Sequence, residues 1–308
     1  MKIISGLLCA LLTVCSVVAE EGYVLIRTGE KVYFHSEIFD SKAATFLMLP
    51  GIYRGLDRDD KIIKLFIKNK VNYVAIHFSG HPSSVLQLEK NETAIFKSGN
   101  GLTSQILADE VAAVSRVLEI KRPIIVSLSY SSTVVQYLDP QVFPVAIETA
   151  PLGAFGEEDP VGTAQRKAWA DWLKLWPGNY LWVQAATDKA YRDHWSVEAS
   201  ERAANYPGIN VTALTEGYMA MARAIEDYDI RTQDFLKSPR RIWVLAENED
   251  EFRRQLQDEA VAISNQVLQR ADKSIVVSGS GHNIPMEQPQ AYYKVLMGLM
   301  KNLKSLEN

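Results

Sequence analysis

Residues 123–138 read PIIVSLSYSSTVVQYL, and this stretch decides the fold. A run of β-forming residues meets a helical stretch with only SLSYS, residues 127–131, between them. A side chain at the apex of so tight a strand-to-helix turn sits on strained backbone, so the residues two before and two after it must be small. The two outer serines meet that requirement. The sequence therefore predicts Ser129 as a candidate nucleophile, with the Tyr130 amide at the N-terminus of the following helix.

Short apolar runs alternate with helical stretches on both sides of this turn. The predicted strands after the first hairpin lie within residues 44–51, 71–80, 122–129, 143–151, 240–250 and 274–282, and the predicted helices lie within residues 58–70, 104–120 and 251–270. Such alternation indicates crossover units and a parallel sheet buried on both faces. A hairpin predicted over residues 23–39 adds antiparallel pairing. We therefore expect an α/β fold with a mostly parallel central sheet flanked by helices.

The alternation stops between residues 152 and 238, and the stretch there is mostly helical. It contains five of the six tryptophans: Trp169, Trp172, Trp176, Trp182 and Trp195. We expect a helical cap over residues 152–238, inserted into a core formed by residues 20–151 and 239–308. In one interpretation the tryptophans are the core of the cap itself, and in the other some of them line an apolar substrate pocket.

The first 19 residues have the composition of a secretory leader. A positive start, an apolar run and small residues before Glu20 predict a signal peptide removed after Ala19, and thus a secreted or periplasmic protein without a stable membrane span. A membrane anchor, or a lipoprotein modified at Cys15, is the alternative. Both cysteines, Cys9 and Cys15, lie in this leader, so disulfides and thiol chemistry are excluded for the remainder.

Charge and ligand spacing exclude further classes of function. The formal net charge is −4, which becomes −5 when the leader and its single charged residue, Lys2, are removed. No run of five basic residues occurs, so a nucleic-acid partner is not expected. His77 and His81 are four residues apart, but Gly80 and Pro82 prevent a helix that would present both to a metal. Neither a metal nor another cofactor is implied.

A serine hydroxyl is a poor nucleophile near its ordinary pKa, so it needs a histidine base that an acid holds in the correct tautomer. Among five histidines, His282 lies directly after the last predicted strand and before the last helix. His35 and His77 lie within predicted strands and His194 lies in the predicted cap, where a structural role is expected. His282 is therefore the candidate base for Ser129.

From about Tyr23 to the C-terminus, the order of these parts resembles the α/β-hydrolase fold family. The stretch around the candidate base is the most specific evidence for this resemblance. It is similar to the terminal Gly-His-x-x-x-x-Glu-x-Pro signature of the family, with Gly281, His282, Glu287 and Pro289 in the matching places.

The acid is expected after the strand in RRIWVLAENEDEF, residues 240–252, which ends in several carboxylates. The resemblance to the family's Gly-x-x-Asp pattern selects Asp250, with Glu247 in place of the glycine. Glu249 is the nearest alternative. Glu148, which follows the strand FPVAIETAP, is another, because some family members take their acid from that position.

The resemblance also implies two backbone donors for an oxyanion. The family's His-Gly-x loop corresponds here to Pro50-Gly51-Ile52, so the amides of Ile52 and Tyr130 are the expected donors. The stretch HFSGHPSS is similar to the family's Asp-x-x-Gly-His-Gly-x-Ser, and it makes His81 a loop-packing residue rather than a catalytic one.

Together, the resemblance implies a hydrolase whose triad is Ser129, Asp250 and His282. The expected reaction is two-step acyl transfer on an ester, and the expected partner is a small-molecule substrate with an apolar acyl part. An amidase or proline-type peptidase with the same triad is the alternative enzyme. A non-catalytic binding protein of the same fold stays open because the chain departs from the family pattern at Pro50, Ser127, Ser131 and Glu247.

Overall fold

The computed structural model describes most of the chain from Val18 onward. The described residues are 18–25, 31–52, 55–86, 102–151, 180–224, 239–249 and 274–306, together with residues 254, 257, 258, 261 and 262.

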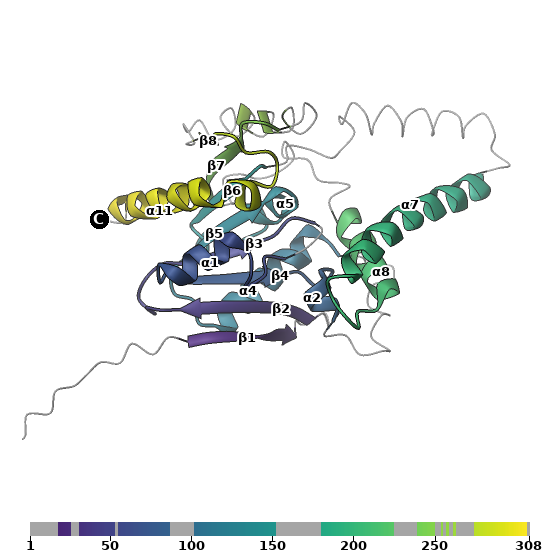
Figure 1. The fold of residues 1–308 in the computed structure, drawn as a ribbon, viewed down its shortest axis with the longest axis horizontal. Helices are drawn as coiled ribbons and strands as arrows, with labels where there is room; N and C mark the ends of the chain where they lie inside the picture. Colours follow the sequence, from purple (N-terminus) through teal and green to yellow (C-terminus); the bar gives the residue numbers. More distant parts are fainter. Residues whose placement is uncertain are drawn as a thin grey trace, which may run out of the picture.

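Eight strands of the described residues form one sheet in the order β1-β2-β4-β3-β5-β6-β7-β8 (Figure 1). They are β1 (Val18–Leu25), β2 (Lys31–Ile38), β3 (Thr45–Leu49), β4 (Tyr73–His77), β5 (Pro123–Leu128), β6 (Val145–Thr149), β7 (Arg240–Ala246) and β8 (Ser274–Val277). β2 pairs antiparallel with β1 and β4, and every other pairing in this sheet is parallel. The predicted mostly parallel sheet and its antiparallel hairpin are therefore confirmed.

Helices cover both faces of the sheet, which is why its central strands are apolar throughout. All five residues of β3 and all five of β4 are buried. On one face, α1 (Lys61–Lys68) buries Ile62, Ile63 and Phe66 beside α11 (Pro289–Leu306) (Figure 1). On the other face lie α4 (Ser104–Val117) and α5 (Ser132–Val135).

Two long helices, α7 (Tyr180–Ala203) and α8 (Val211–Arg223), lie in sequence between β6 and β7 and pack against each other (Figure 1). The ring of Trp195 is buried there, 6.0 Å from that of Tyr218. For this tryptophan, the interpretation as internal packing is confirmed. The side chains of Trp169, Trp172, Trp176 and Trp182 lie outside the described residues, and the domain boundaries stay a prediction.

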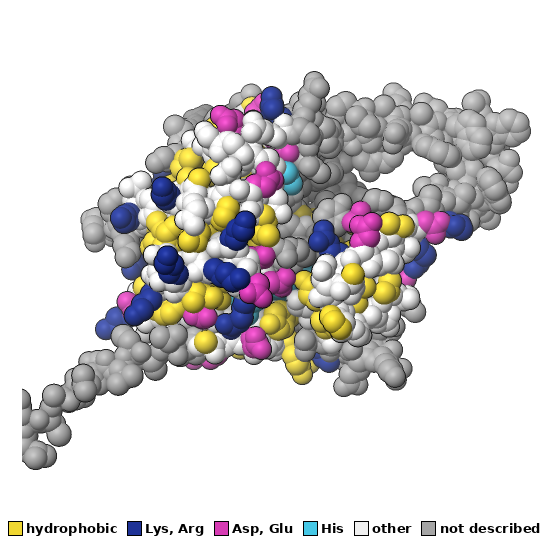
Figure 2. All heavy atoms as spheres, in the orientation of Figure 1, with side chains coloured by type: hydrophobic (Ala, Val, Ile, Leu, Met, Phe, Trp, Pro, Cys, Tyr) yellow, Lys and Arg dark blue, Asp and Glu magenta, His cyan; other side chains and the backbone are white. Residues whose placement is uncertain are grey.

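The surface of the described part carries charges of both signs. Lys and Arg side chains are interspersed with Asp and Glu over the face that carries α1 and α11 (Figure 2). In the same part of the chain, each helix is too short or too polar to cross a lipid bilayer. Residues 1–17 of the predicted leader lie outside the described residues, and β1 begins at Val18.

Candidate active site

The turn after β5 places Ser129 at the carboxyl edge of the sheet. Ser129 has a φ of 51°, a left-handed conformation that is strained for a residue with a side chain. Ser131 is fully buried behind it: its Oγ accepts from the Leu128 amide at 2.8 Å and lies 3.0 Å from the Leu49 carbonyl oxygen of neighbouring β3. A larger side chain at position 131 would push apart the ends of the adjacent strands β3 and β5. Ser127 is fully buried as well.

His282 links the Ser129 hydroxyl to a buried carboxylate. Its Nε2 lies 2.7 Å from Ser129 Oγ, and its Nδ1 lies 2.6 Å from Glu249 Oε2. A carboxylate only accepts, so Nδ1 carries the proton and Nε2 presents its lone pair to the hydroxyl. The Glu249 side chain is 2% exposed and that of His282 is 23% exposed. The imidazole therefore contacts a buried carboxylate through Nδ1, while the ring itself is partly exposed to solvent.

The acid in contact with His282 is Glu249, the alternative weighed from the sequence. Asp250, which the family pattern selected, lies outside the described residues, so its assignment stays a prediction. Glu247 is exposed and accepts from the Gly279 amide at 2.7 Å. Glu148 forms an ion pair with Arg241 at 3.2 Å, and both side chains are almost fully buried. The carboxylate of Glu148 is therefore paired with the guanidinium of Arg241 on the adjacent strand, β7.

A second carboxylate holds the loop that carries the histidine. Glu287 accepts from the amides of Gly281 at 2.6 Å and Asn283 at 3.0 Å, one on each side of His282. A Cβ added at Gly281 would come within 2.9 Å of Glu287 Oε2, so the Glu287 carboxylate would have to move from its present position. Glu287 ends α10 (Ile284–Glu287), one turn beyond the histidine. These hydrogen bonds explain why the Gly-His-x-x-x-x-Glu signature places a glutamate five residues after the histidine: its carboxylate holds the loop on both sides of the ring.

The opposite side of the site is the loop after β3, which carries Ile52. His81 is fully buried beneath this loop, and its Nε2 donates to the Gly51 carbonyl oxygen at 2.8 Å. Burial lowers the pKa of His81 to about 4, so the ring is neutral near pH 7. The predicted loop-packing role of His81 is confirmed. The amides of Ile52 and Tyr130 as oxyanion donors stay a prediction.

The Tyr130 side chain connects the nucleophile turn to α8. It is buried, and its hydroxyl donates to the Met221 carbonyl oxygen at 3.0 Å. The sequence predicts only a backbone role for Tyr130, because no local pattern indicates that its side chain reaches a helix about 90 residues further on. This contact fixes one end of α8 beside Ser129.

The histidines of β2 and β4 have structural partners. Nε2 of His35 lies 2.5 Å from the Leu56 carbonyl oxygen, and Nε2 of His77 lies 3.1 Å from the same atom. Burial lowers the pKa of His35 below its ordinary value. The expected structural role is confirmed for these two, while the side chain of His194 lies outside the described residues.

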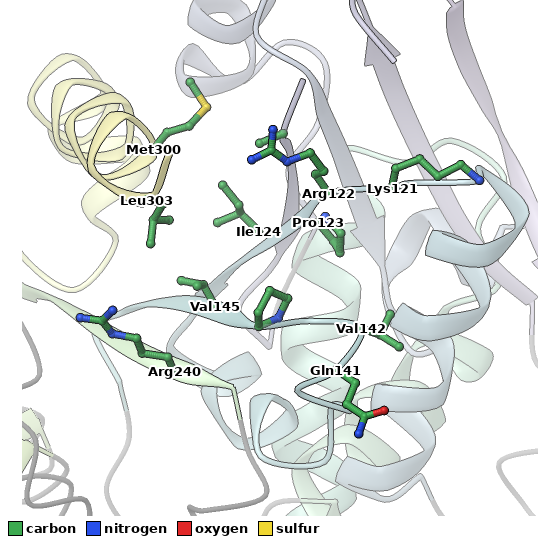
Figure 3. Close-up of a pocket in the computed structure, with 12 residues that line it drawn as sticks. Lys121, Arg122, Pro123, Ile124, Gln141, Val142, Val145, Arg240, Met300 and Leu303 are labelled. Carbon is green, nitrogen blue, oxygen red and sulfur yellow. The ribbon is translucent and has the colours of Figure 1, made fainter. Parts of the chain in front are cut away.

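A cavity of about 390 Å³ lies at the other edge of the sheet, where β5, β6 and β7 begin (Figure 3). Leu303 of α11 lies there with Ile124 and Val145, and Arg240 starts β7 beside them. Ser129 follows the carboxyl end of β5, so this cavity is separated from the reacting hydroxyl by the length of the strands. In open α/β sheets ligands bind outside the carboxyl ends of the strands, and this is the edge that carries Ser129.

Comparisons with solved structures agree with this fold. The chain is 15% identical to a structure described under carboxylesterases of the thaumarchaeon Nitrososphaera gargenis, with a TM-score of 0.61 over 92% of this chain and 99% of that one. It is 15% identical to a thermophilic esterase from Thermogutta terrifontis, with a TM-score of 0.60 and the same two coverages. An enol-lactonase from Burkholderia xenovorans is 14% identical, with a TM-score of 0.58 over 91% of this chain and 100% of that chain.

No curated protein matches the sequence. The sequence profile described as the alpha/beta hydrolase family matches residues 46–295, which is most of the chain and includes the nucleophile turn and the histidine loop. The chain therefore belongs to the alpha/beta hydrolase family and is a hydrolase.

Proposed function

We propose that the protein is a serine hydrolase that cleaves carboxylic esters, with Ser129 as nucleophile, His282 as base and Glu249 as acid. The observation that carries this proposal is the unbroken chain of two short contacts, 2.7 Å from Ser129 Oγ to His282 Nε2 and 2.6 Å from His282 Nδ1 to Glu249 Oε2. We assign to Glu249 the role that the family pattern gives to Asp250, because among the described residues its carboxylate is the one in contact with the ring.

The proposed reaction has two steps of acyl transfer. His282 Nε2 takes the Ser129 proton while Oγ bonds to the carbonyl carbon, and the protonated ring then gives that proton to the departing alcohol oxygen. A water molecule, deprotonated by the same nitrogen, attacks the acyl-enzyme and releases the acid and the free serine. The amides of Tyr130 and Ile52 stabilise the oxyanion in each step. Glu249 keeps the ring in the required tautomer and offsets its positive charge.

An ester is the favoured substrate because an alcohol leaves more easily than an amine, and because similar structures include an esterase and an enol-lactonase. We propose that residues 152–238 form a cap over the site and accept a small molecule with an apolar acyl part. The link from Tyr130 to α8 supports this, since it brings the insertion beside the nucleophile turn. We further propose that residues 1–19 are a leader and that the protein acts outside the cytoplasm.

Active-site labelling with a fluorophosphonate probe tests the proposal. We expect labelling of the wild type at Ser129, found by peptide mass spectrometry, and none in Ser129→Ala. Ser127→Ala is the matched control, since this neighbouring serine is fully buried and should leave labelling intact. A panel of short-chain esters and aminoacyl amides then identifies the bond. Faster turnover of the amides would replace the esterase proposal with an amidase, and absence of both labelling and turnover would leave only a binding function.

A further inference from the structure

We propose that Gln257 is a positioning residue that holds the Glu249 carboxylate against His282. This inference rests on the proposed function, because it assigns a role at the same site to a residue that contacts the proposed acid. Gln257 Nε2 donates to Glu249 Oε2 at 2.8 Å, and that oxygen is also the one that accepts from His282 Nδ1. Gln257 is 3% exposed, so water competes little for this contact.

The other end of the Gln257 amide fixes its orientation. Its Oε1 faces the amide of Ala246, the last residue of β7, at an N–O distance of 3.4 Å. A backbone amide only donates and a carboxylate only accepts, so the side-chain oxygen must face Ala246 and the nitrogen must face Glu249. A reversed amide would lose both interactions. Gln257 therefore joins the end of the strand to the carboxylate in one orientation.

The backbone of the acid is held from the same stretch. Arg254 donates through its guanidinium to the Glu249 carbonyl oxygen at 2.8 Å. Positions 254 and 257 are both helical and are three residues apart, which places them on one side of a helix. One residue thus constrains the main chain of Glu249 and the other its carboxylate.

A glutamate needs this constraint more than an aspartate would. Its side chain has one more rotatable bond, so more conformational freedom must be lost before the carboxylate points at the ring. A neutral amide also suits the chemistry. A lysine or arginine at position 257 would neutralise the carboxylate that must offset the charge on His282 during the reaction. A glutamine orients the acid and leaves its negative charge available to the imidazole.

The test compares Gln257→Leu with Gln136→Leu. Gln136 is also a buried glutamine with side-chain hydrogen bonds, but its partners are Thr133 and Arg241. We expect Gln257→Leu to lower kcat about 10- to 100-fold with little change in KM, by analogy with the loss seen when the hydrogen-bond partner that orients a metal-binding side chain is removed. Gln136→Leu should lose thermal stability while kcat is retained. Gln257→Asn, which keeps an amide too short to bridge both partners, serves if the leucine variant fails to fold.

A second readout separates positioning from a merely structural role. The Nδ1 proton between His282 and Glu249 should give a far-downfield proton NMR signal in the wild type, since a short bond to a carboxylate deshields it. We expect this signal to shift or broaden in both Gln257 variants and to persist in Gln136→Leu. A folded Gln257 variant with wild-type kcat and an unchanged signal would overturn the inference. Failure of the proposed function shows differently, as activity that survives in Ser129→Ala.

Discussion

At the scale of single residues, the site depends on one carboxylate oxygen shared by two donors. Glu249 Oε2 accepts from His282 on one side and from Gln257 on the other, in a nearly dry environment. A buried carboxylate that lacked these donors would carry a large desolvation cost. These contacts give the buried carboxylate two hydrogen-bond donors and favour the ring tautomer whose Nε2 presents its lone pair to the Ser129 hydroxyl.

Exchanging the two candidate acids for their amides decides which of them serves the histidine. We expect Glu249→Gln to lower kcat for ester hydrolysis about 1,000- to 10,000-fold, because an amide no longer holds the ring in its reactive tautomer. Asp250→Asn should retain kcat. Steady-state kinetics on a short-chain ester gives both values. The reverse pattern would return the role of acid to Asp250.

The buried His81 makes stability depend on pH. Its folded pKa of about 4 lies below the ordinary 6.5, so between these values the unfolded chain binds more protons. The contribution of the neutral His81 ring to the free energy of unfolding is fully present above about pH 6.5 and is lost as the pH falls towards 4. The total loss attributable to this residue is about 3 kcal/mol. Urea unfolding at pH 7 and pH 4.5 measures the loss. His81→Gln, which keeps a donor for Gly51, should lose less unfolding free energy between these two pH values. A loss as large as that of the wild type would exclude His81 as the cause of the pH dependence.

At the scale of elements, α8 is attached to the sheet through two glycines. A Cβ added at Gly217 of α8 would come within 2.8 Å of the Gly80 carbonyl oxygen and 3.1 Å of its Cα. Gly80 lies in the loop directly after β4, so the helix backbone rests on the loop backbone. With the hydroxyl of Tyr130 on Met221, this contact fixes α8 at two points near the carboxyl edge of the sheet. The helix α8 is thus anchored beside the candidate site.

Two helical glycines provide a matched test of this attachment. Replacing glycine by alanine within a helix ordinarily stabilises it by about 0.5–1 kcal/mol. We expect that gain for Gly298→Ala in α11, where an added Cβ meets no atom within 4 Å. Gly217→Ala should instead lower stability, because Gly80 must move. Urea unfolding of both variants gives the sign of each change in the free energy of unfolding. A Gly217→Ala variant more stable than the wild type would contradict the close contact with Gly80.

Sequence patterns predicted the strands well and the short helices poorly. Continuous apolar runs mark β3, β4 and β5 because both faces of the sheet are covered. The helical stretch expected after the Ser129 turn is α-helical only over α5 (Ser132–Val135). Thr133, Val134 and Val135 are β-branched and favour helix weakly, and Pro140 restricts the residue before it.

The candidate site was predictable where its geometry is local. His282 is held by Glu287, five residues away, so a short signature contains the whole arrangement. The choice between Glu249 and Asp250 depends on the path of the chain beyond β7 and on Gln257, whose approach no short motif specifies. The loop after β7 was therefore predictable from the family pattern, while the contact between Glu249 and the ring depends on the three-dimensional path of that loop.

At the scale of the whole molecule, parallel strands bring distant parts of the chain to one edge. Ser129 follows β5, Glu249 follows β7 and His282 follows β8, and these strands lie in the order β5-β6-β7-β8. Carboxyl ends of parallel strands share one edge, so segments more than 150 residues apart meet there. The antiparallel strands β1 and β2 form the opposite end of the sheet from β7 and β8 (Figure 1).

This layout predicts that removal of residues 1–19, the proposed leader, leaves fold and activity intact. Cleavage after Ala19 deletes only the pairs Val18–Ile38 and Ala19–Glu37 from an edge strand, and the six pairs from Glu20 to Leu25 remain. Arg58 also holds this segment through the Glu20 carbonyl oxygen and the Glu21 carboxylate. We expect the chain starting at Glu20 to unfold at the same urea concentration as the full chain and to hydrolyse esters equally fast.

A deeper truncation is the control for this prediction. Removing residues 1–25 deletes β1 entirely and uncovers part of the core, because Val24 is buried against it. It also leaves β2 as an unprotected sheet edge. That variant should unfold at lower urea and aggregate more readily. N-terminal mass spectrometry of the protein exported from expressing cells locates the cleavage, and a chain that keeps residues 1–19 while held in the membrane would establish an anchor in place of a leader.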